Sequence, residues 1–222
     1  METIEIIQSI CHDNPQIAFL LFYPLSKQQL LQSRIQIGEK EKLQYIQALS
    51  IREKYHLPFW DSIMLTMFNN HNFSSSIMNA AMLHNKLQSP IKIEVNTKLK
   101  EKLDRLRIQS FGWNSLIELK NGKTQHIPMF DFHIPVSPTN TNVVRNVLEQ
   151  LGLTTGYILN SGESYHYIHN KPIDYNDFKI ILIQSLFFSP IIDRLWVAHQ
   201  LLNESAMLRI GMKHGKYPTT IL

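Results

Sequence analysis

The chain has 222 residues, of which 44% are hydrophobic and 18% charged, which allows one sizeable core and excludes long disordered tracts. Its single cysteine, Cys11, excludes an internal disulfide framework and suits a reducing, cytoplasmic location. The most apolar runs, 17–23 and 180–192, are too short or too interrupted by polar residues to span a membrane, and the acidic start is unlike a signal peptide. We therefore expect no membrane association.

The excess positive charge lies in the second part of the chain. Residues 1–90 hold seven basic and seven acidic residues, whereas residues 91–222 hold 15 basic and 11 acidic ones. No acidic residue follows Glu204, while Arg209, Lys213 and Lys216 do. Charge of this kind fits a phosphate-bearing partner and an ordinary solvated surface equally well.

Residues 1–90 are expected to form a helical accessory region. Only one of the eight glycines precedes Gly112, and glycine is typical of the turns between strands. Hydrophobic residues recur at helical spacing in segments 2–10, 26–55, 59–68 and 76–87. The run Ile17–Tyr23 fits either a buried strand or a short helix. Since this region carries no catalytic pattern, we interpret it as a layer that could dock a protein partner.

From residue 91 the pattern changes to strands and helices in alternation. Strands are expected at 91–95, 115–119, 124–134, 155–160, 165–169 and 206–212. Helices are expected at 99–108, 141–151, 174–187 and 193–202. Asn121-Gly122 between two apolar runs is a strong hairpin signal, so strands 115–119 and 124–134 should pair. The order predicts an α+β domain over residues 91–222.

Two polar residues interrupt the apolar strand expected at 124–134. Asp131 and His133 lie two positions apart, and the alternation of a strand directs both side chains to the same face. A carboxylate in such a strand is destabilising unless it is paired or faces a cleft. The hairpin would fix the register and hence the face that Asp131 occupies. The pair indicates a metal or proton-transfer site, and an ion pair of Asp131 with Arg209 is the structural alternative.

A second polar signature, Ser161-Gly162-Glu163-Ser164-Tyr165-His166, leads into the strand expected at 165–169. Gly162 would allow a close backbone approach, and His166 could donate to a phosphate oxygen. Serine and glycine are also ordinary hairpin residues. Further along, Arg209, Lys213 and Lys216 could complete a triphosphate clamp. Asp193, taken alone, is typical of a helix N-cap.

In this order the motifs resemble those of the archaeo-eukaryotic primase superfamily, which includes the primase-polymerases. Phe130-Asp131-Phe132-His133 is similar to the first motif, the Ser161–His166 turn to the second, and the segment 189–196 with Leu208-Arg209-Ile210 to the third region. The resemblance covers residues 110 to 222. The fold it implies is α+β, with an RRM-like, primase-type antiparallel sheet and packed helices, preceded by the helical N-terminal region.

The resemblance also implies a set of site residues. Asp131, His133 and Asp193 would be catalytic and would bind Mg²⁺ or Mn²⁺. Ser161, His166, Arg209 and Lys213 would bind the nucleotide's phosphates. The substrates would be nucleoside triphosphates and a single-stranded DNA or RNA template.

One departure from the family pattern bears on activity: His133 stands where the family has a second carboxylate, which removes a negative charge from a site for two cations. The leading hypothesis is a primase-like nucleotidyltransferase. The alternative is a catalytically inactive relative that binds nucleotide or nucleic acid as a regulatory or defence-associated subunit. A metal-dependent phosphoesterase built from the same Asp and His residues is a third class.

Overall fold

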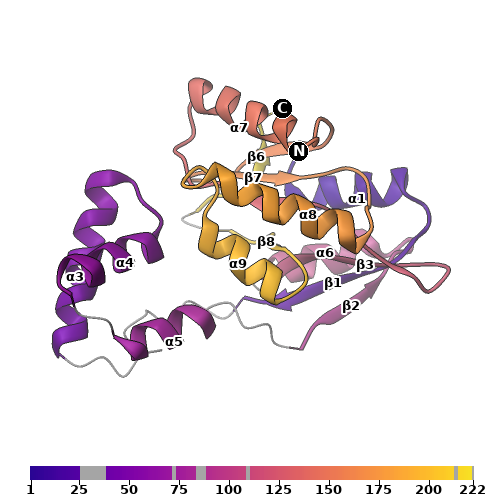
Figure 1. The fold of residues 1–222 in the computed structure, drawn as a ribbon. Coiled ribbons are helices and arrows are strands. Elements are labelled where there is room, and N and C mark those ends of the chain that lie inside the picture. The colour runs from indigo at the N-terminus through magenta and orange to yellow at the C-terminus, as the bar shows by residue number, and fades with distance from the viewer. Residues whose placement is uncertain (26–38, 72–73, 84–88, 109–110, 213–214, 222) are drawn as a thin grey trace. The chain divides into compact units, whose positions relative to one another are not determined.

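The computed structural model describes residues 1–25, 39–71, 74–83, 89–108, 111–212 and 215–221 (Figure 1). The chain divides into two compact units, the first formed by Met1–Leu25 and Leu87–Leu222 and the second by Ser26–Lys86. The first unit is a mixed α+β structure with antiparallel strands, as the sequence predicts. No helix in the described part of the chain is long and apolar enough to cross a membrane.

The strands of the first unit form two antiparallel sheets. The first sheet has the order β2-β1-β3-β4, and β8 also pairs with β3. Its strands are β1 (Ile17–Pro24), β2 (Ile91–Glu94), β3 (Phe111–Leu119), β4 (Thr124–His126) and β8 (Met207–Arg209). The second sheet has the order β5-β7-β6-β9. Its strands are β5 (Met129–Asp131), β6 (Tyr157–Asn160), β7 (Tyr165–Ile168) and β9 (Thr219–Thr220).

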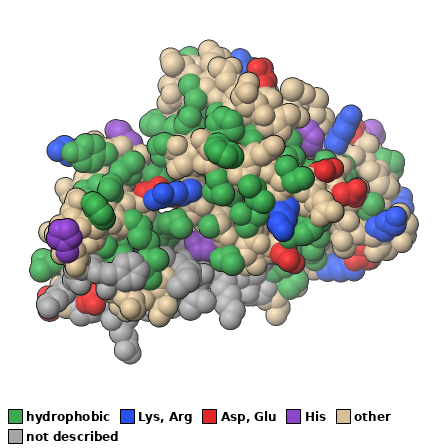
Figure 2. Space-filling model, in the orientation of Figure 1, with side chains coloured by type: hydrophobic (Ala, Val, Ile, Leu, Met, Phe, Trp, Pro, Cys, Tyr) green, Lys and Arg blue, Asp and Glu red, His purple; other side chains and the backbone are tan. Residues whose placement is uncertain are grey.

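Helices accompany both sheets in the first unit. They are α1 (Thr3–Asp13), α6 (Leu99–Ile108), α7 (Pro138–Gln150), α8 (Tyr175–Ser185) with the 3₁₀ turn η1 (Leu186–Phe188), and α9 (Arg194–Leu202). The helix expected at 141–151 begins earlier, because the Ser137 side chain accepts a hydrogen bond from Asn140 N and caps α7. Hydrophobic side chains gather over α8 and α9 on the face seen in Figure 2, and Ile180 and Phe187 are among those exposed.

The N-terminal residues belong to the first unit, which differs from the helical region expected over 1–90. The ambiguous run 17–23 is the strand β1, which pairs with both β2 and β3. Ile17, Leu20 and Phe22 of β1 are at most 1% exposed. A strand with a neighbour on each side pairs its backbone groups and buries its apolar side chains. The run 17–23 is therefore part of the sheet, and it does not belong to a helical accessory region.

The expected hairpin is confirmed, but the strand that follows it is shorter than predicted. Gly122 has φ +79° and Leu119 N donates to Lys123 O over 2.8 Å, so β3 turns into β4. The continuous strand expected at 124–134 is wrong, because β4 and β5 lie in different sheets with Pro128 between them. Proline lacks the N–H that would continue the pairing with β3. The register at Asp131 is therefore set by β7, and not by the hairpin.

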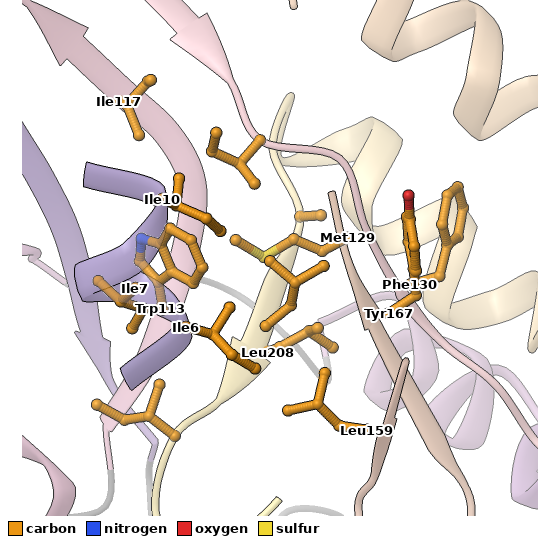
Figure 3. Close-up of a cluster of buried hydrophobic side chains, with 14 of the residues drawn as sticks. Ile6, Ile7, Ile10, Trp113, Ile117, Met129, Phe130, Leu159, Tyr167 and Leu208 are labelled. Atoms are coloured by element: carbon orange, nitrogen blue, oxygen red, sulfur yellow. The ribbon is translucent and has the colours of Figure 1, made fainter. Parts of the chain in front are cut away.

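The core of the first unit lies between the sheets and α1. Figure 3 shows Met129 and Leu159 of the second sheet on the side of Trp113 and the isoleucines of α1, whereas Phe130 and Tyr167 lie on the opposite side of their strands. All are at most 2% exposed. Both faces of the second sheet are thus covered by apolar side chains, and a polar side chain in it requires a partner.

The second unit is helical in its described part. It contains α3 (Glu39–Tyr55), α4 (Phe59–Asn69) and α5 (Ser75–Leu83). Pro58 precedes α4, in which Ile63 and Met67 are buried. The helical segments expected at 26–38 and 84–87 fall outside the described residues.

Candidate functional site

Asp131 is flanked on both sides by segments that carry a predicted site residue. It is the last residue of β5, and its register partner in β7 is His166. On the other side of β5, an antiparallel bridge joins Phe132 to Ile192, and His133 N donates to Ile191 O over 2.7 Å. Continued by one residue beyond this bridge, the antiparallel register pairs Asp193 with Asp131. We call His166, Asp131 and Asp193 the central row.

The burial along β5 alternates as the sequence predicts. Phe130 and Phe132 are each 1% exposed, while Asp131 and His133 are both half-buried. Residues two apart in an extended segment share a face, so Asp131 and His133 lie on the face that also carries Met129. That face is directed toward the first sheet (Figure 3).

Asp131 and His166 form a close pair of unequal exposure. Nε2 of His166 lies 3.6 Å from Oδ1 of Asp131, and the side chains are 6% and 40% exposed, respectively. The two groups attract each other when His166 is protonated. The carboxylate is thus open to solvent on one side and lies against a buried imidazole on the other.

Arg209 joins the two sheets next to this pair. It lies at the end of β8, and its guanidinium donates to Gly211 O over 2.9 Å and to Ser161 O. Burial lowers the pKa of Arg209, and the carboxylates of Asp131 and Glu163 oppose that shift. The charges of two carboxylates therefore act on a partly buried guanidinium, which lowers the cost of keeping Arg209 charged.

The turn after β6 is held by its own hydrogen bonds. Ser161 N and Oγ donate to Ser164 O over 2.9 and 3.1 Å, and Gly162 N donates to Asn160 Oδ1 over 2.8 Å. Gly162 has φ +109°, a conformation that favours glycine. The Ser161 hydroxyl therefore shapes the turn, and the backbone carbonyl of Ser161 is the group that receives Arg209.

Asp193 caps α9, which was the structural interpretation of this residue. Its Oδ1 accepts hydrogen bonds from Leu195 N over 2.8 Å and from Trp196 N over 3.2 Å. Both cap bonds use the same oxygen. The residue thus combines a cap with a position in the central row.

The donors in and around the central row suit a metal ion that arrives with a phosphate-bearing ligand. Within the described residues, no group of three or more His, Cys, Asp and Glu side chains is arranged to hold a metal ion by itself. Mg²⁺ is usually held by one or two carboxylates together with substrate phosphates, and Asp131 and Asp193 lie on the two segments that the Phe132–Ile192 bridge joins. His133 adds an imidazole, which Mn²⁺ accepts more readily than Mg²⁺. The residues fit such an ion and do not form an all-protein cage.

Two further residues bear on the site, Lys213 and Glu163. Lys213, expected to bind phosphate, lies outside the described residues. Glu163, for which no role was expected, acts through its charge on Arg209. Glu163 lies inside the Ser161–His166 signature, and this position could have drawn attention to it in the sequence. Its charge acts on Arg209 only because β8 of the other sheet lies close to the turn.

An α+β unit whose strands bring together an Asp-x-His pair, a Ser-Gly…His turn and a later aspartate has the organisation of a primase-type domain. Residues 94–221, more than half of the chain, match the family described as archaeo-eukaryotic primase 1D-like. The chain therefore belongs to this primase-like family. The match begins at the last residue of β2 and includes every predicted site residue. No curated protein and no solved structure matches the chain.

Proposed function

We propose that this chain is a primase-like nucleotidyltransferase that joins nucleotides on a single-stranded nucleic-acid template. The observation that carries the proposal is the central row, in which Asp131 has His166 on one side and Asp193 on the other. Segments that carry three motifs far apart in the sequence thus lie next to one another at β5. The structural roles of these residues, such as the capping of α9 by Asp193, would not by themselves require the three segments to lie together.

The residues of the site divide into anionic and cationic groups. Asp131 and Asp193, with His133 beside them, would hold Mg²⁺ or Mn²⁺, which when bound neutralises phosphate charge and polarises the phosphoryl group. His166 of β7 lies next to Asp131, and Arg209 of β8 is influenced by the Asp131 charge, so both would contact the phosphates of a nucleoside triphosphate. The two backbone hydrogen bonds of Arg209 hold its guanidinium in position before the ligand binds.

A second candidate function is a catalytically inactive relative that binds nucleotide or nucleic acid as a regulatory or defence-associated subunit. Two observations favour it. His133 supplies no negative charge where the family has a carboxylate, and Oδ1 of Asp193 is engaged in capping α9. The first removes a negative charge that two divalent ions need, and the second engages one of the carboxylate oxygens that would bind them.

The two candidates are separated by nucleotide extension on single-stranded DNA and RNA templates with Mg²⁺, with Mn²⁺ and with EDTA. We expect product with Mn²⁺ in excess of that with Mg²⁺, and none with EDTA. Asp131→Asn should lower the rate on the order of 100-fold, the loss typical of removing one group that stabilises charge in the transition state. The matched control is Asp177→Asn, an exposed acid on α8, which should leave the rate unchanged.

His133→Asp provides a complementary test. Restoring the carboxylate should raise the rate with Mg²⁺ relative to Mn²⁺, because oxygen donors suit Mg²⁺ better than imidazole does. Absence of product with either metal, together with triphosphate binding in calorimetry, would establish the inactive relative. Template-independent phosphate release would instead indicate a phosphoesterase, and full activity of Asp131→Asn would refute the site.

A further inference from the structure

We infer that a hollow at the joined chain ends binds one nucleotide of a single-stranded nucleic acid, with its base against Tyr217 and its phosphate at Lys216. The inference rests on the proposed function only for the class of partner. The hollow has a volume of about 260 Å³ and is lined by Glu2, Asn160, Lys216, Tyr217 and Thr219. None of these residues belongs to the central row.

Several residues that line the hollow belong to paired backbone segments. Thr219 pairs with Asn160 in the second sheet and forms an antiparallel bridge with Glu2. The N-terminal amine of Met1 donates to Thr220 Oγ1 over 2.8 Å. Figure 1 shows the two chain ends side by side. Glu2, Asn160 and Thr219, which line the hollow, thus belong to paired backbone segments of the fold.

One face of the Tyr217 ring is supported by a cation. The guanidinium carbon of Arg107, on α6, lies 4.6 Å from the ring centroid. Arg107 is in turn held by an ion pair with Glu2. Tyr217 is half-buried and also lines the hollow. A ring fixed in this way is a suitable platform for a base, since stacking on aromatic side chains is the sequence-tolerant contact of single-strand binding.

The charges favour a neutral group inside the hollow and a phosphate at its rim. The Glu2 carboxylate is paired with Arg107 and caps α1, and it adds no cation that would attract a phosphate into the hollow. Asn160 and Thr219 provide an amide and a hydroxyl. Lys216 is exposed and offers the single ammonium of the lining. A base with a 5′-phosphate has this distribution of charge.

The volume of the hollow indicates that it binds one unit of a longer ligand. Sites that enclose a whole drug-sized molecule occupy about 300–1,000 Å³. At about 260 Å³ the hollow is smaller than these sites, so it suits one nucleotide that continues into a chain at both ends. Asn160 also receives Gly162 N, and Arg209 holds the neighbouring Ser161 carbonyl. The hollow therefore borders the turn that is connected to the central row.

The test is fluorescence anisotropy with a fluorescein-labelled single-stranded decamer, measured without nucleotide or metal. Tyr217→Leu should weaken binding by about 5- to 150-fold, the range for loss of one stacked base. Tyr217→Phe keeps the ring and should bind as the wild type does. Lys216→Gln should lower the slope of log Kd against log salt concentration by about 0.7, the value for one phosphate contact on a single strand.

Further variants separate this inference from the proposed function. Asp131→Asn should lower the extension rate on the order of 100-fold and leave decamer binding unchanged. If extension fails while decamer binding depends on Tyr217, the inference about the hollow is supported and the catalytic proposal is refuted. Wild-type affinity in a Tyr217→Leu variant that melts at the wild-type temperature would overturn the hollow, whatever the extension result. Should Tyr217→Leu not fold, Lys216→Gln decides alone, because its side chain is exposed, and an unchanged salt slope would overturn the inference.

Discussion

Arg209 illustrates how a single residue connects a structural role with a functional one. Its guanidinium is partly buried, donates to two backbone carbonyls and is influenced by the charges of Asp131 and Glu163. A buried cation is destabilising unless such partners surround it. The same partners hold it beside the central row. Stability and phosphate binding therefore depend on one side chain.

The buried imidazole of His126 should make the stability of the protein depend on pH. His126 is 3% exposed, its ring stacks on Phe178 at 4.5 Å, and its Nδ1 lies 3.2 Å from Ser115 Oγ. Burial lowers the pKa of His126 to about 4, below the usual value of 6.5. Between these two values the unfolded chain binds more protons than the folded one, so the free energy of unfolding should fall as the pH drops through this window.

The measurement is urea unfolding between pH 7 and pH 4, in the wild type and in His126→Phe. The variant keeps an aromatic ring against Phe178 and removes the titrating group. Its free energy of unfolding should depend less on pH, although burial also lowers the pKa of His169, so part of the dependence should remain. Identical pH profiles of the two proteins would contradict the assignment.

Among the elements, the hairpin β3–β4 joins two neighbouring strands of the first sheet through a turn at Gly122. Gly122 has φ +79°, and nothing lies within 4 Å of a Cβ built there, so only backbone strain opposes a side chain. We expect Gly122→Ala to lower the free energy of unfolding by about 1–2 kcal/mol, the cost of a left-handed conformation with a Cβ. Chemical denaturation provides the measurement.

The matched control for the hairpin is the neighbouring exposed residue, Lys123. Its carbonyl accepts from Leu119 N in either variant, so Lys123→Ala should change stability by less than about 0.5 kcal/mol. Equal effects of the two substitutions would mean that strain at Gly122 does not contribute to the stability of the turn.

At the scale of the whole molecule, the second unit is an insertion between two paired strands. Phe22 of β1 is the register partner of Ile91 of β2, although residues 26–86 separate the strands in the sequence. The chain therefore leaves the first unit and re-enters it at neighbouring strands. A short loop joins such antiparallel neighbours readily.

Replacing residues 26–86 by a short Gly/Ser loop should leave a protein that unfolds cooperatively. The two sheets and their core lie in the first unit, so circular dichroism should retain strand and helix signals, and one transition should appear in denaturant. Extending the deletion to residue 17 removes β1 and should abolish that transition, since β3 loses its longest partner. A shortened protein without a cooperative transition would show that the units depend on each other.

Much of the first unit followed from local patterns. The alternation of 91–95, the amphipathic spacing of 99–108 and the Asn121-Gly122 turn each predicted an element that the structure contains. The capping role of Asp193 was also predictable, because a carboxylate before a helix satisfies free N–H groups. The division at Pro128 and the inclusion of β1 were missed, because both depend on which strands are neighbours.

Local patterns in the amino-acid sequence were enough to predict the family, the α+β class, the residues of the motifs and the alternation that directs Asp131 and His133 to one face. Three features appear only in the folded chain: β7 sets the register of Asp131, the segment before α9 pairs with the residues that follow β5, and Arg209 approaches from the other sheet. The difference lies in the sequence distance over which each feature is encoded. Local periodicity encodes how each element forms, whereas the pairing of strands distant in sequence is chosen by the burial of the whole core.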